Sequence, residues 1–165
     1  MMMKRKWAVW AAILLLFNPA RLLAAELAVN LELPEIDAAE YHRPYVAVWL
    51  EDGQRRQVLQ MALWVEKEKW HRDLRSWWRR GGNQLVLPVD GVSGATRKPG
   101  DYRVVAQADL VPGRYTLHVE SVREVGGREH LRFPFEWSGE MLQFSKAGQS
   151  ELGSVTATIN PENAP

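Results

Sequence analysis

The amino-acid sequence predicts an all-β protein, an Ig-like β-sandwich of about seven to eight antiparallel strands with one helical insert. Three observations support this fold class. Apolar and polar residues alternate through most of the chain after residue 26. Turns that contain glycine separate the alternating segments, and a single segment changes to the helical period of about 3.6 residues.

The first predicted strand lies near residue 30, where apolar residues occupy every second position from Leu27 to Leu33 and so share one face. Residues 45–51 are nearly all apolar, as expected for a strand that is covered on both sides. Asp52-Gly53 suits a tight hairpin turn because both residue types tolerate positive φ. Residues 58–65 would form the return strand of that hairpin.

The second half of the chain continues the strand pattern. Further strands are predicted at residues 84–89, 102–107, 114–122, 130–137 and 153–159. Gly126-Gly127 provides a second hairpin turn. Pro134 has no backbone N–H to donate to a neighbouring strand, so its strand is predicted to lie at a sheet edge or to carry a bulge.

Residues 66–80 are predicted to form the helical insert, which Gly81-Gly82 can end. One stripe of this helix carries Trp70, Leu74, Trp77 and Trp78, and the opposite side carries Arg72, Arg75 and Arg79. Core packing is the preferred interpretation of the stripe. The alternative is a binding surface, where guanidinium groups beside aromatic rings receive a phosphate or a planar ring.

The start of the chain has the order of a secretory signal. Residues 1–25 are predicted to be a signal peptide, residues 26–160 a single β-sandwich domain, and residues 161–165 a loose C-terminal tail. Three basic residues precede an apolar run over residues 7–17, which is too short to cross a membrane unaided. An uncleaved N-terminal membrane anchor is the alternative.

Charge and cysteine usage limit the possible functions. Residues 1–25 hold four of the 21 basic residues and none of the 20 acidic ones, so the mature chain has a formal charge of −3. This charge gives no support to a nucleic-acid partner. The absence of cysteine excludes disulfide bonds, thiolate metal sites and thioether haem attachment.

No conventional catalytic site is visible. The histidines are expected to be surface or half-buried structural residues, since no two have metal-ligand spacing: His42, His71, His118 and His130. The chain lacks an exposed-serine elbow, a phosphate loop and a dinucleotide fingerprint. The sequence therefore predicts neither a metal ligand nor a catalytic residue, and an enzyme with an unrecognised site ranks last among the hypotheses.

The stretch DGVSGAT, residues 90–96, is the candidate site. As an ordinary turn it is well explained, because its glycines permit tight backbone and Asp90 and Ser93 can bond to nearby backbone. That explanation does not require Thr96. A hydroxyl nucleophile that a second enzyme must reach needs an exposed, bendable loop, and Gly94 and Ala95 remove side-chain bulk just before it.

The same stretch resembles the attachment motif of ApbE-type flavin transferases, D-x-x-S/T-G-A/S-T. Those enzymes move FMN from FAD onto the threonine hydroxyl. The matching residues are Asp90, Ser93, Gly94, Ala95 and Thr96. The resemblance implies that Thr96 carries FMN through a phosphoester and that the other four residues form the loop that the transferase recognises.

A wider resemblance covers most of the chain after residue 26. Residues 43–52, 62–70, 73–80, 90–100 and 113–124 are similar to domain-of-unknown-function family 2271, bacterial periplasmic proteins that often occur with PepSY-type membrane proteins and flavin transferases. This implies an exported electron-transfer protein that relays electrons from a PepSY-type membrane reductase to an extracytosolic acceptor. One of the three insert arginines would neutralise the flavin phosphate or the reduced ring. The alternative is a non-redox periplasmic β-sandwich, a binding or structural protein in which DGVSGAT is only a turn.

Overall fold

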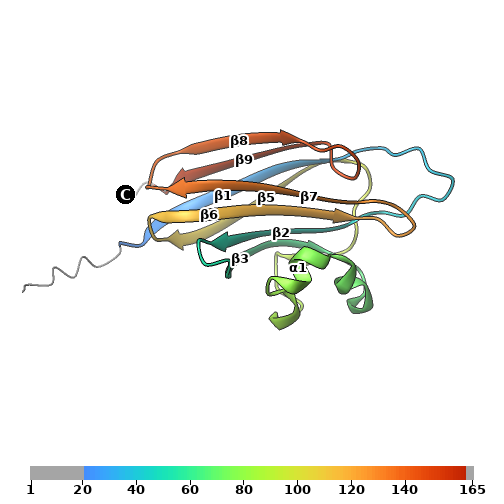
Figure 1. The fold of residues 1–165 in the computed structure, drawn as a ribbon, viewed down its shortest axis with the longest axis horizontal. Coiled ribbons are helices and arrows are strands. Elements are labelled where there is room, and N and C mark those ends of the chain that lie inside the picture. Colours follow the sequence, from blue (N-terminus) through green and yellow to red (C-terminus); the bar gives the residue numbers. More distant parts are fainter. Residues whose placement is uncertain (1–20, 163–165) are drawn as a thin grey trace, which may run out of the picture.

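The computed structural model describes residues 21–162 and shows two packed β-sheets (Figure 1). One sheet has the strand order β5-β1-β9-β8, and the other has the order β4-β3-β2-β6-β7. The strands are β1 Leu23–Leu33, β2 Tyr45–Asp52, β3 Gln57–Trp64, β4 Ser93–Gly94, β5 Gly100–Leu110, β6 Gly113–Val122, β7 Arg128–Trp137, β8 Leu142–Ala147 and β9 Ser154–Pro161. The predicted all-β sandwich is confirmed.

The set of strands differs from the sequence prediction at three places. Residues 85–89 form no strand; Leu85 and Leu87 pack instead against the outer face of the five-stranded sheet. The sequence also does not predict β4 or β8. Alternating apolar residues suit a strand and a loop that lies on a sheet equally well, so the pattern alone cannot separate the two.

The main core lies between the two sheets. The residues of β1 that were expected to share one face, Leu27 to Leu33 at every second position, are all at most 1% exposed. They belong to one buried cluster with Val48 of β2 and Leu117 of β6. Burying these side chains is the main favourable contribution to folding in a chain that has no disulfide bond.

The ends of the sandwich extend slightly past the predicted domain limits. β1 begins at Leu23, which pairs with Leu110 of β5, and Ala25 is fully buried beside Pro161 of β9. The limits at residues 26 and 160 therefore fall inside strands. Residues 1–20 of the predicted signal peptide and residues 163–165 of the predicted tail lie outside the described residues.

The outer face of the five-stranded sheet is also covered, by the insert that contains η1 Glu68–Asp73, α1 Arg75–Arg79 and η2 Gly82–Gln84 (Figure 1). Leu74 and Trp77 are fully buried in a second cluster with Tyr45, and the ring of Trp70 stacks on Tyr45 with 5.5 Å between centroids. The interpretation of the stripe as core is confirmed for Leu74 and Trp77, whereas Trp70 and Trp78 are half-buried at the edge of this cluster.

The insert is not the single helix predicted over residues 66–80. Leu74 has ψ 71°, a non-helical value, and it separates η1 from α1. The buried carboxylate of Glu120 on β6 accepts hydrogen bonds from the backbone N–H groups of Ser76 at 3.1 Å and Trp77 at 2.8 Å. These N–H groups have no partner within the helix, so a side chain of the sheet caps α1 and sets where it begins.

Pro134 lies in β7, which is an edge strand of the five-stranded sheet. Its missing N–H therefore costs no hydrogen bond between central strands. The prediction of an edge position from Pro134 is confirmed.

Candidate functional site

The DGVSGAT stretch runs along an edge of the five-stranded sheet. Its residues Ser93–Gly94 form β4, which pairs in parallel with β3. The backbone N–H of Leu63 donates to the carbonyl of Val92, and that of Val65 donates to the carbonyl of Gly94, both at 2.9 Å. β4 is the last strand of the sheet, so no further strand pairs with its other side, where the N–H of Ser93 donates to the carbonyl of Val89 at 2.9 Å.

The first half of the stretch is a tight turn. Ser93 Oγ accepts a hydrogen bond from the N–H of Val89 at 3.0 Å, and Gly91 has φ +73°, which favours glycine. The turn thus explains Ser93 and Gly91. Asp90 is exposed, and among residues 21–162 its carboxylate has no hydrogen-bond partner, in contrast to the backbone contact that the turn interpretation expects.

The second half of the stretch has features that the turn does not explain. Thr96 is half-buried, and its Oγ1 donates a 3.0 Å hydrogen bond to Oε1 of Glu66, an exposed residue. Gly94 and Ala95 are exposed. A Cβ added to Gly94 would lie 3.7 Å from Trp64, an ordinary contact, so packing does not require glycine there.

The residues after Thr96 are held against the same edge. The Arg97 guanidinium lies 4.2 Å from the ring centroid of Trp64 and 5.1 Å from that of Tyr102, and the Tyr102 hydroxyl donates to the carbonyl of Lys98 at 2.7 Å. Thr96 therefore stands in a short exposed span that is fixed on both sides, rather than in a freely bendable loop. The sequence does not single out Arg97, because Trp64 and Tyr102 meet only in the folded chain.

A groove of about 330 Å³ opens next to Thr96 on the outer face of the sheet. It is lined by Leu63, Val65, Glu66, Glu68, His71, Trp78, Gly82, Asn83, Leu85, Leu87, Pro88 and Ser93. Glu66, which holds the Thr96 hydroxyl, is part of this lining, so the groove and the hydroxyl are neighbours. Most of the other walls are aliphatic or aromatic, as is usual for a site that takes an organic ring.

One side of the groove is aromatic. His71 is buried edge-on against Trp77 with 5.6 Å between centroids, and burial lowers the pKa of His71, so its ring is neutral at pH 7. Trp78 is half-buried, and the guanidinium of Arg72 lies 5.6 Å from its ring centroid.

The three insert arginines do not act together. Arg72 lies beside Trp78 and hence beside the groove. Arg79 donates through Nε to the carbonyl of Arg75 at 3.1 Å and lines a different hollow with Gln57. Of the three, only the Arg72 guanidinium lies over an aromatic ring that lines the groove; Arg75 and Arg79 are exposed and do not line it.

Two histidines that are distant in sequence meet on the outer face of the five-stranded sheet. Nδ1 of His118 lies 2.9 Å from Nε2 of His130, and the ring of His118 stacks on Trp49 with 4.6 Å between centroids. His118 is only 2% exposed and His71 is buried, so these two are more buried than the sequence suggests. Within the described part of the chain, no group of three or more His, Cys, Asp or Glu side chains could hold a metal ion.

These features define an all-β sandwich domain with a partly covered outer face and a half-buried threonine hydroxyl beside a sheet edge. The chain belongs to the family DUF2271, predicted periplasmic proteins, whose model matches residues 26–154. The family description agrees with the expected periplasmic location. No curated protein and no solved structure matches the chain. Among residues 21–162, no helix has the length and apolar character needed to cross a membrane.

Proposed function

We propose that this protein is an exported electron carrier that holds FMN covalently on Thr96 and passes electrons from a PepSY-type membrane reductase to an extracytosolic acceptor. The position of Thr96 carries this proposal. Its hydroxyl stands beside the edge strand β4, bonded to an exposed carboxylate and next to a groove lined by both apolar and polar side chains. A second enzyme can reach such a hydroxyl without unfolding the sandwich.

In the proposed attachment step, Thr96 Oγ1 forms a bond to the phosphorus of the FMN half of FAD. The phosphoanhydride bond to the AMP half breaks, AMP leaves, and the hydroxyl proton passes to a base of an ApbE-type transferase. Asp90, Ser93, Gly94 and Ala95 would be the residues that the transferase recognises. The exposure of Asp90 and the absence of a packing role for Gly94 support this assignment.

The residues around Thr96 fit a flavin linked through its phosphate. Arg97 follows Thr96 directly and provides a guanidinium for the phosphate charge. The groove provides apolar walls and the half-buried ring of Trp78 for the isoalloxazine, with Arg72 beside it to stabilise an anionic reduced ring. When bound, FMN supplies the redox chemistry, and the protein sets its access and potential.

Co-expression with an ApbE-type transferase tests the proposal. After export and purification, the wild-type chain should keep yellow fluorescence on denaturation and should gain the mass of one FMN less one water. Thr96→Ala should carry no adduct, Thr96→Ser should carry it, and Thr116→Ala on the distant β6 serves as a matched control. An unmodified wild-type chain would refute the proposal, and an adduct on Thr96→Ala would refute the site.

A non-redox periplasmic sandwich is the second candidate. One observation favours it: the turn at Val89 fully explains Ser93 and Gly91 without any modification. In that case the groove would bind a small apolar molecule or a partner directly. An unmodified wild-type chain in the presence of an active transferase would favour this candidate.

A further inference from the structure

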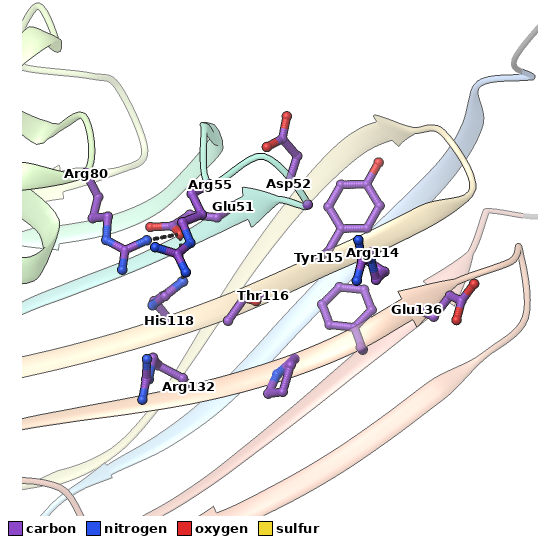
Figure 2. A pocket seen from close by; sticks show the side chains of 13 residues that line it. Glu51, Asp52, Arg55, Arg80, Arg114, Tyr115, Thr116, His118, Arg132 and Glu136 are labelled. Carbon is purple, nitrogen blue, oxygen red and sulfur yellow. Dashed lines mark hydrogen bonds and ion pairs between the residues drawn. The ribbon is translucent and has the colours of Figure 1, made fainter.

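A second hollow, of about 550 Å³, is lined by residues near the end of β2 and by residues of β6 and β7 (Figure 2). Its charged and histidine lining comes from several segments of the chain: Glu51, Asp52, Arg55, Arg80, Arg114, His118, Arg132 and Glu136. Figure 2 shows the side chains of Arg55, Arg80 and Arg132 gathered around His118. Guanidinium groups repel one another, so such a cluster needs compensation by negative charge.

Two of the three acidic residues of the lining, Glu51 and Asp52, are already paired with other groups. Glu51 is 2% exposed; its Oε2 pairs with Nη1 of Arg80 at 2.7 Å, and its Oε1 accepts from the indole N–H of Trp49 at 3.0 Å. Asp52 pairs with Arg56 at 2.7 Å, and Arg56 is not part of the lining. These carboxylates therefore leave little negative charge for the remaining arginines.

Three guanidinium groups of the hollow, those of Arg55, Arg114 and Arg132, form no ion pair in the part of the chain that the structure describes. Arg55 and Arg132 are both exposed. Arg114 lies opposite Glu136 in the strand register, the nearest acidic residue of the lining to it, although the two form no ion pair. Next to the hollow, Lys146 donates to the carbonyl of Arg132 and adds a further positive charge.

His118 is the buried polar group at the base of this cluster. Its side chain is 2% exposed, and its Nε2 has no hydrogen-bond partner although it lies 3.3 Å from Oε2 of Glu51. Two facing acceptors would repel, so Nε2 carries the proton and Nδ1 accepts from Nε2 of His130. The imidazole of His118 is thus neutral and buried at the base of the hollow, with its Nε2–H directed toward Glu51.

We propose that this hollow binds a small molecule through a carboxylate or phosphate group, held by the guanidinium groups of Arg55, Arg80 and Arg132 above the neutral imidazole of His118. Guanidinium groups match the planar carboxylate and the phosphate oxygens, and a bound anion would relieve their mutual repulsion. The volume exceeds that of a single phosphate, and Pro134 supplies apolar surface for the rest of the ligand.

This site does not depend on a flavin at Thr96. Glu51 lies near the end of β2, whereas the attachment stretch pairs with Leu63 and Trp64 of β3, which lie opposite the start of β2. Strand length therefore places Glu51 about 15 Å from the attachment stretch, whereas the groove and the hollow approach each other at Gly82 and Arg80. The Thr96→Ala variant is expected to bind the anion as well as the wild type does.

Isothermal titration calorimetry of the exported chain with inorganic phosphate and, separately, with citrate tests the proposal. Sodium chloride at matched ionic strength is the blank. We expect saturable binding of at least one anion, weakened about tenfold or more in Arg132→Gln and further in the double variant with Arg55→Gln, because each removes a charge-assisted hydrogen bond. Both residues are exposed, so the fold should persist, which circular dichroism verifies.

The pattern of the two titrations identifies the ligand chemistry: phosphate binding alone indicates a phosphate group, and citrate binding alone indicates a carboxylate. Arg103→Gln on β5, in the other sheet, is the matched control and should bind as the wild type does. Absence of saturable binding by both anions would overturn the proposal. Binding that the double variant retains in full would overturn it equally.

Discussion

The hydroxyl of Thr96 and the carboxylate of Glu66 are joined by a 3.0 Å hydrogen bond across 30 positions of sequence. This contact holds the proposed attachment hydroxyl at the edge of the groove. It also places a negative charge where a phosphoester would carry another. The hydrogen bond favours the attachment of FMN, whereas the negative charge of Glu66 disfavours it. Replacing Glu66 by an uncharged acceptor separates the two effects.

Glu66→Gln should speed the proposed modification. The amide keeps an acceptor for the Thr96 hydroxyl but removes a charge that repels the phosphate, an effect of about 1 kcal/mol at contact distance in water. We therefore expect roughly a fivefold faster appearance of the flavin adduct in a time course with transferase and FAD. Glu68→Gln, which lines the same groove without contacting Thr96, should change the rate less. Slower labelling of Glu66→Gln would mean that the carboxylate activates the hydroxyl instead.

Gly82→Ala should lower the free energy of unfolding by disturbing how the insert packs on the sheet. A Cβ at this position would lie 2.5 Å from the ring of Trp77, which is fully buried and cannot move aside. Overpacking of this kind costs about 1–3 kcal/mol, measurable by urea unfolding with tryptophan fluorescence. Gly53→Ala is the control, since a Cβ there meets its nearest atom at 3.4 Å. Equal stability of both variants would show that Trp77 has room to shift.

Acid should destabilise the protein through its histidine pair. Burial, reinforced by the nearby charges of Arg80 and Arg132, lowers the pKa of His118 to about 3 and that of His130 to about 4. Glu51 lies close enough to oppose this shift, but Arg80 matches its charge. Below the ordinary histidine pKa the unfolded chain binds protons that the folded chain does not. The free energy of unfolding should therefore be level above about pH 6.5 and fall toward pH 4.

His130→Asn should make the free energy of unfolding depend less on pH between about pH 4.5 and 6.5. The slope should fall by up to about 1.4 kcal/mol per pH unit, the contribution of one titrating group. Urea unfolding at several pH values measures it. His42→Asn is the control, because His42 sits at the surface beside Glu40. The window excludes the range where Asp52 and Glu129, whose pKa values are lowered by hydrogen bonds from backbone N–H groups, begin to titrate. An unchanged slope in His130→Asn would contradict the assignment.

A chain that begins at Glu26 should be less stable than one that begins at Arg21. Residues Leu23 to Ala25 pair with β5, Ala25 is fully buried, and the N–H of Glu162 donates to the carbonyl of Ala24 at 2.9 Å. Loss of these contacts should cost about 1–3 kcal/mol in thermal or urea unfolding. A chain that begins at Leu23 should match the longer one. Equal stability of all three would mean that the start of β1 adds nothing.

Much of the sandwich is predictable because strand faces are encoded locally. The alternation from Leu27 to Leu33 and the restriction that Pro134 places on its strand depend on neighbouring residues alone, and both predictions are confirmed. The prediction of a strand over residues 84–89 was wrong because the same alternation also suits a loop that packs on a sheet. The candidate stretch from Asp90 to Thr96 was found through its residue pattern, and its modification stays a prediction.

The sequence by itself determined the fold class, the inward face of most strands and the interpretation of Leu74 and Trp77 as core, since periodicity reports which side of an element is buried. Tertiary structure alone decided that Glu120 caps α1, that Arg97 stacks on Trp64, and that His118 meets His130 under a cluster of arginines. Each of these contacts joins residues brought together by strand register and sheet order. Strand register and sheet order depend on the free energy of the whole chain, so they cannot be read from any short stretch of sequence.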